Sequence, residues 1–181
     1  MTTIHIADAV TARATIPSLC DVLSDCVQGG ASVGFMLPFE PKDACGYWAQ
    51  VADEVEGGRT ILAIAETEGK VVGTVQVGLA TKPNQPHRGD LMKLLVHRSA
   101  RGRGLSRLLM DAVEAEAARR GRTLLVLDTA AGSEAESIYP RLGWQRVGTI
   151  PDYAMWPQGG LCGTTLFYKR IGNGGGGTPS P

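Results

Sequence analysis

The residues best suited to chemistry lie in one segment, 94–111, with the sequence LLVHRSARGRGLSRLLMD. In this segment an apolar stretch is followed by a basic, glycine-rich loop and then by the first turn of an expected helix. Backbone N–H groups at a helix start lack intrahelical acceptors, and the helix dipole favours negative charge at that end. Gly102 and Gly104 let a ligand approach the backbone closely, and Arg101 and Arg103 add positive charge. The segment therefore predicts a site for an anion such as a phosphate group.

Other classes of glycine-rich loop fit this segment less well. A P-loop needs a Lys after its spacer, and none is present. A dinucleotide-binding GxGxxG motif begins a parallel βαβ unit, whereas two helices and a hairpin are expected before this loop. An RGG-type nucleic-acid-binding region is repetitive and disordered, but RGRG occurs here once, inside an apolar frame. A purely structural turn before a helix remains as an alternative.

Composition limits the partners that we expect. Eighteen basic side chains balance eighteen acidic ones, so no overall field draws the protein to nucleic acid or to an anionic membrane. The four cysteines form no CxxC pair and are not grouped with the three histidines, so we expect no metal site. The N-terminus lacks the pattern of a signal peptide, and no stretch approaches the ~20 apolar residues of a membrane span. These observations favour a cytoplasmic protein with reduced thiols.

The first sixty residues predict one strand and two helices. Residues 3–7 form an apolar strand, and apolar residues recur at helical spacing after Pro17 and again after Pro41. A proline suits the first turn of each helix, and a glycine pair ends each one.

The remaining residues predict six strands and two helices. In order, these are strands at 60–66, 71–82 and 90–97, a helix from Leu105 to about Gly121, a strand at 123–129, a short helix at about 133–142, and strands at 144–149 and 165–171, with an irregular segment at 150–163. This order predicts one α/β domain over residues 1–171, with a mixed sheet and helices on both sides. The tail 172–181, GNGGGGTPSP, is expected to be flexible.

The loop also carries a family resemblance. Arg101-x-x-Gly104-x-Ser106 resembles the R/Q-x-x-G-x-G/A signature of the Gcn5-related N-acetyltransferases (GNAT), and it lies between a strand and a helix as in that superfamily. The resemblance extends over nearly the whole chain, to about residue 171. It implies the GNAT fold of α/β (α+β) class, a mixed, mostly antiparallel sheet of six to seven strands flanked by about four helices. Four further segments resemble the tabtoxin resistance protein type: GGASVGFM (29–36), KPN (82–84), SARGRGL (99–105) and LDT (127–129).

The resemblance implies acetyl-CoA as the cosubstrate and assigns residues to it. A strand that pairs with the pantetheine arm is matched by Leu94, Leu95 and Val96, and a bulge there usually separates two strands. The main chain that holds the pyrophosphate is matched by Arg101, Gly102, Arg103, Gly104, Leu105, Ser106 and Arg107. Ser106 stands where Gly or Ala is usual, and Gly132 stands where many relatives have an Asn that contacts pantetheine, so both contacts are in question.

The resemblance further implies three catalytic residues. Tyr139, in SIYPRLGW, matches a tyrosine that protonates the departing thiolate, with a packed core aromatic as the alternative. An amine with a pKa near ~10 is neutral in only about one molecule in a thousand at pH 7, so its proton needs an acceptor. Asp90 and Asp128 match carboxylates of the relatives. We expect them on opposite sides of the cleft, acting through water. A structural hydrogen-bonding role is the alternative for each.

Other residues receive weaker assignments. Lys93 is expected on a solvated strand face, Trp156 on a lid over the acceptor, and the 29–36 loop at the acceptor floor by resemblance. No Cys or Ser near the motif has a nucleophile–base arrangement, which favours direct attack of the amine in a ternary complex.

The sequence therefore predicts an N-acetyltransferase that acts on an amine of a small molecule, possibly toxin- or antibiotic-like, without a metal. A noncatalytic acyl-CoA-binding module and a protein or peptide N-acetyltransferase remain as alternatives. The sequence does not decide whether the chain forms a homodimer.

Overall fold

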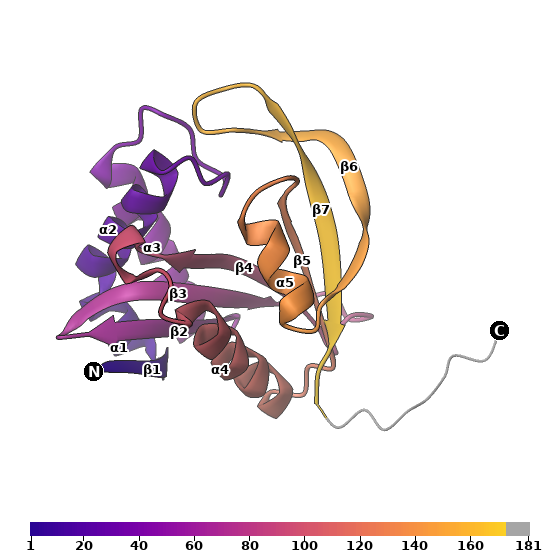
Figure 1. Ribbon diagram of the computed structural model, residues 1–181. Helices are drawn as coiled ribbons and strands as arrows, with labels where there is room; N and C mark the ends of the chain where they lie inside the picture. The colour runs from indigo at the N-terminus through magenta and orange to yellow at the C-terminus, as the bar shows by residue number, and fades with distance from the viewer. Residues whose placement is uncertain (173–181) are drawn as a thin grey trace.

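The computed structural model describes residues 1–172, which form a seven-stranded sheet with helices on both faces (Figure 1). The predicted tail lies, from residue 173 on, outside the described residues. The elements in chain order are β1 (Thr2–Ala7), α1 (Ala9–Ala14), α2 (Ile16–Gln28), α3 (Pro41–Glu56), β2 (Thr60–Thr67), β3 (Lys70–Leu79), β4 (Arg88–Val96), η1 (Arg98–Ala100), α4 (Leu105–Arg119), β5 (Leu124–Ala130), η2 (Ala135–Ser137), α5 (Ile138–Arg141), β6 (Gln145–Met155) and β7 (Leu161–Arg170).

The sheet has the order β1-β2-β3-β4-β5-β7-β6, and only the β4–β5 pair is parallel. The expected mixed, mostly antiparallel sheet is thus confirmed. The β4–β5 pairing is short, because its last pair is Asp90 with Val126. Beyond that pair the two strands diverge, as Figure 1 shows, and the sheet opens at its middle.

A bulge in β4 accompanies this opening. Met92 pairs with Gln76 and Leu95 pairs with Thr74, so two β4 residues face the single residue Val75. Lys93, the first of the two, has a φ of 54°, in the left-handed region. A bulge of this kind bends a strand and increases its local twist, which turns the end of β4 away from β5.

Two hydrophobic cores enclose the sheet. The strand β2 supplies both, because Ile61 and Ala63 face one side and Leu62 and Ile64 the other. Helix α4 packs on the first side, and helices α1 to α3 pack on the second. A strand covered on both faces has a continuous apolar sequence rather than an alternating one, which explains the run ILAIA in β2.

Two details of the elements differ from the sequence prediction. The structure has five α-helices among the described residues, in line with the expected number, and the six-residue α1 lies before the helix expected from Pro17, where no helix was predicted. Its N-cap is Asp8, which accepts a hydrogen bond from the Thr11 N–H at 2.8 Å. The segment 150–163 is not irregular throughout, because β6 continues to Met155 through a register shift and β7 begins at Leu161. Within residues 1–172, no helix is long and apolar enough to span a membrane.

Candidate active site

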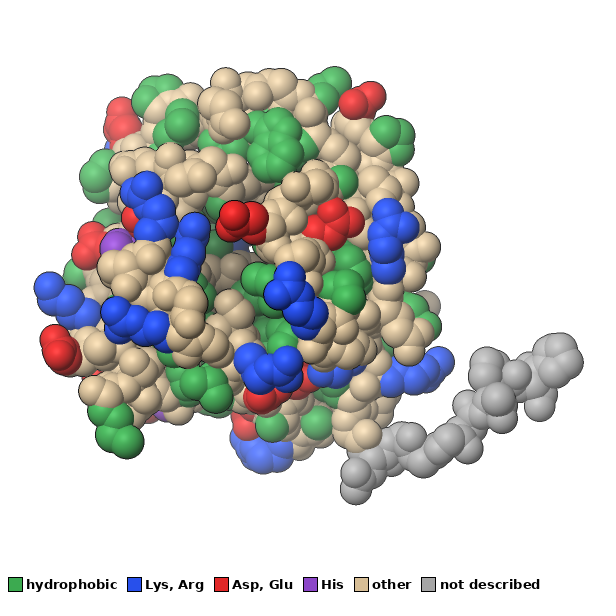
Figure 2. Space-filling view, in the orientation of Figure 1, with side chains coloured by type: hydrophobic (Ala, Val, Ile, Leu, Met, Phe, Trp, Pro, Cys, Tyr) green, Lys and Arg blue, Asp and Glu red, His purple; other side chains and the backbone are tan. Residues whose placement is uncertain are grey.

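A cavity of about 770 Å³ lies where β4 and β5 diverge. Its walls come from six parts of the chain: the 29–34 loop after α2, the end of β4, the loop before α4, the end of β5, the segment from Ser133 to Tyr139 and the β6–β7 hairpin. Figure 2 shows this side of the molecule, where the surface is hollowed near its centre and Lys and Arg side chains stand near the hollow. The volume lies within the ~300–1,000 Å³ of small-molecule sites.

The glycine-rich loop presents bare backbone to this cavity. Gly102 has a φ of 76° and Gly104 a φ of 74°, a conformation that L side chains rarely adopt. Apart from the residues directly before and after each glycine, no residue has a heavy atom within 4 Å of where a Cβ would stand on Gly102 or Gly104. Gly104 is the N-cap of α4, and no side chain caps that helix start. The first N–H groups of α4 are therefore open to an anion, as the sequence predicts.

The side chains of Arg101, Arg103 and Arg107 lie in different places. Arg101 lines the cavity, and its Nε donates to the carbonyl oxygen of Val96 at 3.2 Å. Arg103 donates instead to the carbonyl oxygen of Ser99, and Arg107 to that of Arg141, each at 3.1 Å. The side chains of Arg103 and Arg107 are not part of the cavity wall.

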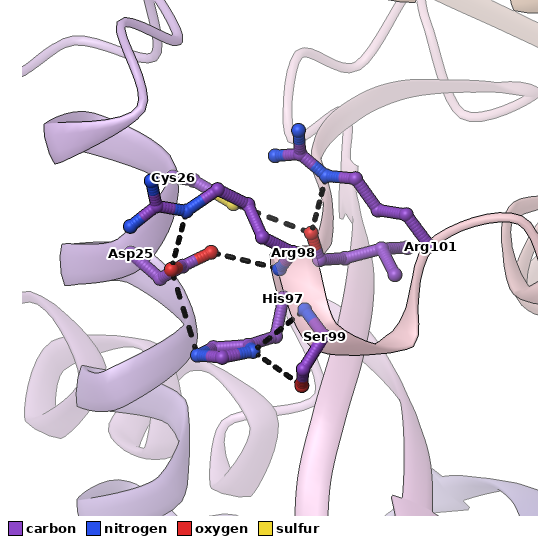
Figure 3. A network of polar contacts seen from close by, with 7 residues as sticks. Asp25, Cys26, His97, Arg98, Ser99 and Arg101 are labelled. Carbon is purple, nitrogen blue, oxygen red and sulfur yellow. Dashed lines mark hydrogen bonds and ion pairs between the residues drawn. The ribbon is translucent and has the colours of Figure 1, made fainter.

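An ionic contact fastens this loop to α2 (Figure 3). The carboxylate of Asp25 accepts hydrogen bonds from the backbone N–H of Arg98 at 2.8 Å and from its Nε at 2.7 Å. His97 Nε2 lies 3.6 Å from the same carboxylate, and its Nδ1 lies 2.8 Å from the Ser99 hydroxyl. Burial acts to raise the pKa of Asp25, but the bonds from Arg98 outweigh it and hold that pKa below its usual value.

The end of β4 supplies a second wall of exposed backbone. Leu94, Leu95 and Val96 all line the cavity, and none has a β5 partner. An unpaired strand edge can hydrogen-bond an extended ligand as though the ligand were an added strand. The expected bulge and splay are therefore present at the place where the sequence predicts a pantetheine arm.

Tyr139 reaches the cavity from the start of α5. Its side chain is 6% exposed and packs against Trp144 and Phe167, with ring centroids 6.1 and 5.5 Å away. It nevertheless lines the cavity. Burial, together with the charge of Asp128, raises the pKa of Tyr139 to about 12. The hydroxyl is therefore protonated at neutral pH and available as a donor.

Asp128 lines the same cavity at the end of β5. The Thr164 hydroxyl, on the neighbouring strand β7, lies 2.9 Å from its Oδ2 and 3.0 Å from the carbonyl oxygen of Thr129. Thr164 is 2% exposed, so its own position is fixed by packing. This arrangement directs a carboxylate into the cavity near Tyr139.

The structure does not bring Asp90 to this cavity. Asp90 belongs to the last hydrogen-bonded pair of β4 and β5, before the strands separate. Its carboxylate pairs with Arg88 Nη1 at 2.7 Å and lines a separate pocket of about 300 Å³. The expectation that the two aspartates flank one cleft is corrected accordingly, because the splay begins one step beyond Asp90.

Residues that the sequence assigns to the acceptor side line the cavity, and Lys93 lies elsewhere than predicted. The 29–34 loop and Trp156 both line the cavity. They meet across it, since the Ser32 hydroxyl donates to the carbonyl oxygen of Met155 at 3.0 Å. Lys93 lies in the cavity wall rather than on a solvated strand face. Strict alternation would have placed Lys93 on the face of Leu91, which packs in the first core, and the bulge at Lys93 and Leu94 interrupts that alternation.

Neither a metal centre nor a histidine-activated nucleophile is found in this part of the chain. Residues 1–172 contain no group of three His, Cys, Asp or Glu side chains placed to hold a metal ion. Cys26 and Cys162 line the cavity, but no histidine does so among the described residues. Burial raises the pKa of the Cys26 thiol, which makes it a poor nucleophile at neutral pH.

Comparisons with known proteins give consistent results. Residues 19–144 match the model of the acetyltransferase (GNAT) family. An "Uncharacterized N-acetyltransferase in hisH-hisA intergenic region" of Azospirillum brasilense is 31% identical over 142 residues, which cover 76% of this chain and 83% of that protein.

Solved structures resemble the fold at low sequence identity. A ribosomal-protein-alanine N-acetyltransferase from Brucella melitensis has a TM-score of 0.78 at 22% identity, covering 93% of this chain and 99% of that one. A putative acetyltransferase from Salmonella typhimurium, solved with its cofactor acetyl-CoA, has a TM-score of 0.77 at 18% identity, covering 99% and 98%. A phosphinothricin acetyltransferase from Sinorhizobium meliloti, in complex with acetyl-CoA, has a TM-score of 0.78 at 15% identity, covering 99% and 93%. The predicted fold is thereby confirmed.

Proposed function

The chain belongs to the acetyltransferase (GNAT) family, and from that premise we propose that it transfers the acetyl group of acetyl-CoA to an amine of a small molecule. The observation that carries the proposal is one cavity in which an anion-binding loop, an unpaired strand edge, a tyrosine hydroxyl and a carboxylate meet. An acetyl-CoA site needs the first two features. Transfer to an amine needs the last two.

The fit to acetyl-CoA rests on backbone chemistry. The open N–H groups at Gly104, Leu105 and Ser106 suit a pyrophosphate, and Gly102 leaves room for its approach. The free edge over Leu94–Val96 suits the amide groups of the pantetheine arm. Arg103 and Arg107 contribute main chain to this site in our proposal, since their side chains are bonded elsewhere.

The reaction then follows from two side chains. The amine nitrogen attacks the thioester carbonyl carbon and loses a proton through water to Asp128. The carbon–sulfur bond breaks, and Tyr139 donates to the departing thiolate. Thiols have pKa values near ~8.5, well below that of Tyr139, so the donated hydrogen bond stabilises the thiolate and solvent restores the proton balance. Direct attack without an acetyl-enzyme is favoured because no histidine lies beside the cavity cysteines among the described residues.

Acetyl-CoA thiol release against a panel of amines tests this function. Amino acids, polyamines, aminoglycosides and tabtoxin-like amines form the panel, and mass spectrometry identifies the acetylated product. We expect at least one amine to give product together with equimolar coenzyme A. Binding of acetyl-CoA without transfer to any amine or peptide would favour a noncatalytic acyl-CoA-binding module instead. An acetyl group trapped on Cys26 or Cys162 would contradict direct attack.

Finer assignments belong to the same proposal. The resemblance to the tabtoxin resistance type suggests a toxin- or antibiotic-like acceptor, and the phosphinothricin acetyltransferase neighbour is loosely in line with that class. The neighbour from Brucella melitensis is named for a ribosomal-protein alanine, so a peptide arm in the panel distinguishes protein acetylation. The four free cysteines fit a reducing cytoplasm, and light scattering decides between a monomer and a homodimer.

A further inference from the structure

Lys93 carries a cation into the cavity from the β4 bulge. Its φ of 54° is uncommon for a residue other than glycine and costs about 1 kcal/mol or more. This backbone conformation directs the side chain to the cavity wall, although the neighbouring residues of β4 pack in the cores or line the strand edge. A strained conformation that persists at a site is a reason to ask what its side chain does there.

Two aromatic rings hold the ammonium group on one side. Lys93 Nζ lies 5.3 Å from the ring centroid of Tyr47 and 5.9 Å from that of Phe35, within the ~6 Å of cation–π contacts. The rings support each other edge to face at 5.6 Å, and the Tyr47 hydroxyl donates to Gln76 Oε1 at 3.1 Å. The rings hold the ammonium group in place by cation–π contacts. They do not provide an oxygen acceptor for its N–H groups.

The ammonium group has no oxygen partner among residues 1–172. Lys93 makes no hydrogen bond there, and no carboxylate oxygen lies within 4.0 Å of it. Burial lowers the pKa of Lys93, while the more distant charge of Asp128 acts to raise it. Three charged side chains besides Lys93 line the cavity: Arg101, Asp128 and Glu134. Arg101 donates through its Nε to a carbonyl oxygen and lies beside the glycine-rich loop that we assign to the pyrophosphate, whereas the Lys93 ammonium makes no hydrogen bond within residues 1–172.

We propose that Lys93 binds a carboxylate of the acceptor, and that the acceptor is an amine that also carries a carboxylate, as a free amino acid does. Asp128 then faces the amino group, so that Lys93 and Asp128 together match the two charges of a zwitterion. This inference rests on the proposed function and names its substrate class. An apolar side chain could pack against the rings of Phe35 and Tyr47 without the free-energy cost of desolvating a charge. A buried lysine carries that cost, and a bound anion such as a carboxylate would offset it.

Matched acceptors test the inference. Each of the twenty amino acids is compared with its carboxamide and with its decarboxylated amine, using wild type, Lys93→Met, Lys93→Arg and the surface control Lys82→Met. Charge-assisted hydrogen bonds predict a preference in kcat/KM of roughly 10- to 100-fold for the carboxylate form in wild type. Lys93→Met should remove that preference through KM and leave the amide and amine forms nearly unchanged. Lys93→Arg should keep part of it, and Lys82→Met all of it.

Three outcomes would overturn the inference. Equal use of amino acids and decarboxylated amines by wild type would leave the acetyltransferase intact but remove the carboxylate anchor. An equal fall for all acceptors in Lys93→Met would assign Lys93 to the chemical step or to the fold. Acetylation of Lys93 itself by acetyl-CoA, seen as a gain of one acetyl group in the intact mass, would show that its amine reacts with the thioester. Lys93 would then not be a carboxylate anchor.

A binding measurement keeps the inference testable if no amine is acetylated. The coenzyme A-saturated protein is titrated by calorimetry with N-acetyl amino acids and with their amides, which bind without reacting. Binding of the acids at least tenfold tighter than the amides in wild type, and equal binding in Lys93→Met, supports the anchor independently of turnover. Equal binding in wild type contradicts it.

Discussion

Replacing Tyr139 by Phe separates its chemical role from its packing role. The substitution keeps the ring, which is 94% buried between Trp144 and Phe167, and removes only the hydroxyl oxygen. Because the apolar surface is preserved, the free energy of unfolding should change by no more than about 1 kcal/mol, the contribution of one hydrogen bond. Acetyl-CoA binding should also persist, since the loop and strand edge that we assign to it are unchanged.

The catalytic effect should be much larger than the effect on stability. Loss of a hydrogen-bond donor that stabilises charge in the transition state commonly slows a reaction by 10²-fold or more, which corresponds to about 2.7 kcal/mol in the activation free energy. The loss should appear in kcat at saturating substrates rather than in KM, because the hydroxyl acts on the departing thiolate. Steady-state thiol release measures kcat, and chemical denaturation measures stability in the same preparations.

Tyr168→Phe is the matched control. Tyr168 lies on β7, and its hydroxyl donates to Gln145 Oε1 outside the cavity wall. This variant should retain full turnover. Full activity in Tyr139→Phe would refute the reasoning, and a parallel loss of activity and stability would favour a core role for the tyrosine.

The pH dependence of stability gives an independent check on Tyr139. Its folded-state pKa is about 12, above its ordinary value of 10.0, so folding favours the protonated form. The associated stability is fully present below pH 10 and is lost as the pH rises from 10 toward 12. Tyr47 has a pKa raised to about 12 by burial and contributes in the same window. Tyr139→Phe should therefore show a smaller loss of unfolding free energy across that window than wild type, by denaturation at stepped pH.

Three further predictions concern the rest of the site. Gly104→Val should lower coenzyme affinity, measured by calorimetry, at least tenfold, or about 1.4 kcal/mol. Gly121→Val is the control: Gly121, at the other end of α4, also has a positive φ, 77°, so both variants should lose similar stability, but Gly121→Val should keep the coenzyme affinity. Asp128→Asn should reduce kcat by roughly 10²-fold and Asp90→Asn by much less, and the reverse order would make Asp90 the base predicted from sequence. Asp25→Asn should raise the KM for acetyl-CoA severalfold, because it weakens the contact that holds the loop to α2. Folding lowers the pKa of Asp25, so wild type should lose stability as the pH falls below about 3.8, and the variant should lose less.

The sequence predicted most of the fold because its signals are local. Apolar periodicity and glycine pairs located the two longer N-terminal helices, and the glycine-rich sequence predicted the loop that precedes α4. The short α1 was missed because six residues give less than two helical turns of pattern. The extension of β6 was missed because the register shift after Ile150 and the left-handed Asp152 break the alternation that identifies a strand.

The site was predicted less completely because its key geometry is not local. Whether Asp90 and Asp128 share a cleft depends on where the β4–β5 pairing stops, and no residue type encodes that point. The inward turn of Lys93 depends on a bulge whose partner, Val75, lies eighteen positions earlier. The only sequence signal for the position of Lys93 is that a lysine interrupts the apolar run LMKLLV.

A crystal structure with bound coenzyme A tests the central claim most directly. We predict the pyrophosphate on the backbone N–H groups around Gly104, the pantetheine arm along Leu94–Val96, and the sulfur atom within about 4 Å of the Tyr139 hydroxyl oxygen, the range of hydrogen bonds that involve sulfur. A coenzyme bound elsewhere, or a sulfur atom separated from Tyr139 by intervening side chains, would contradict the account.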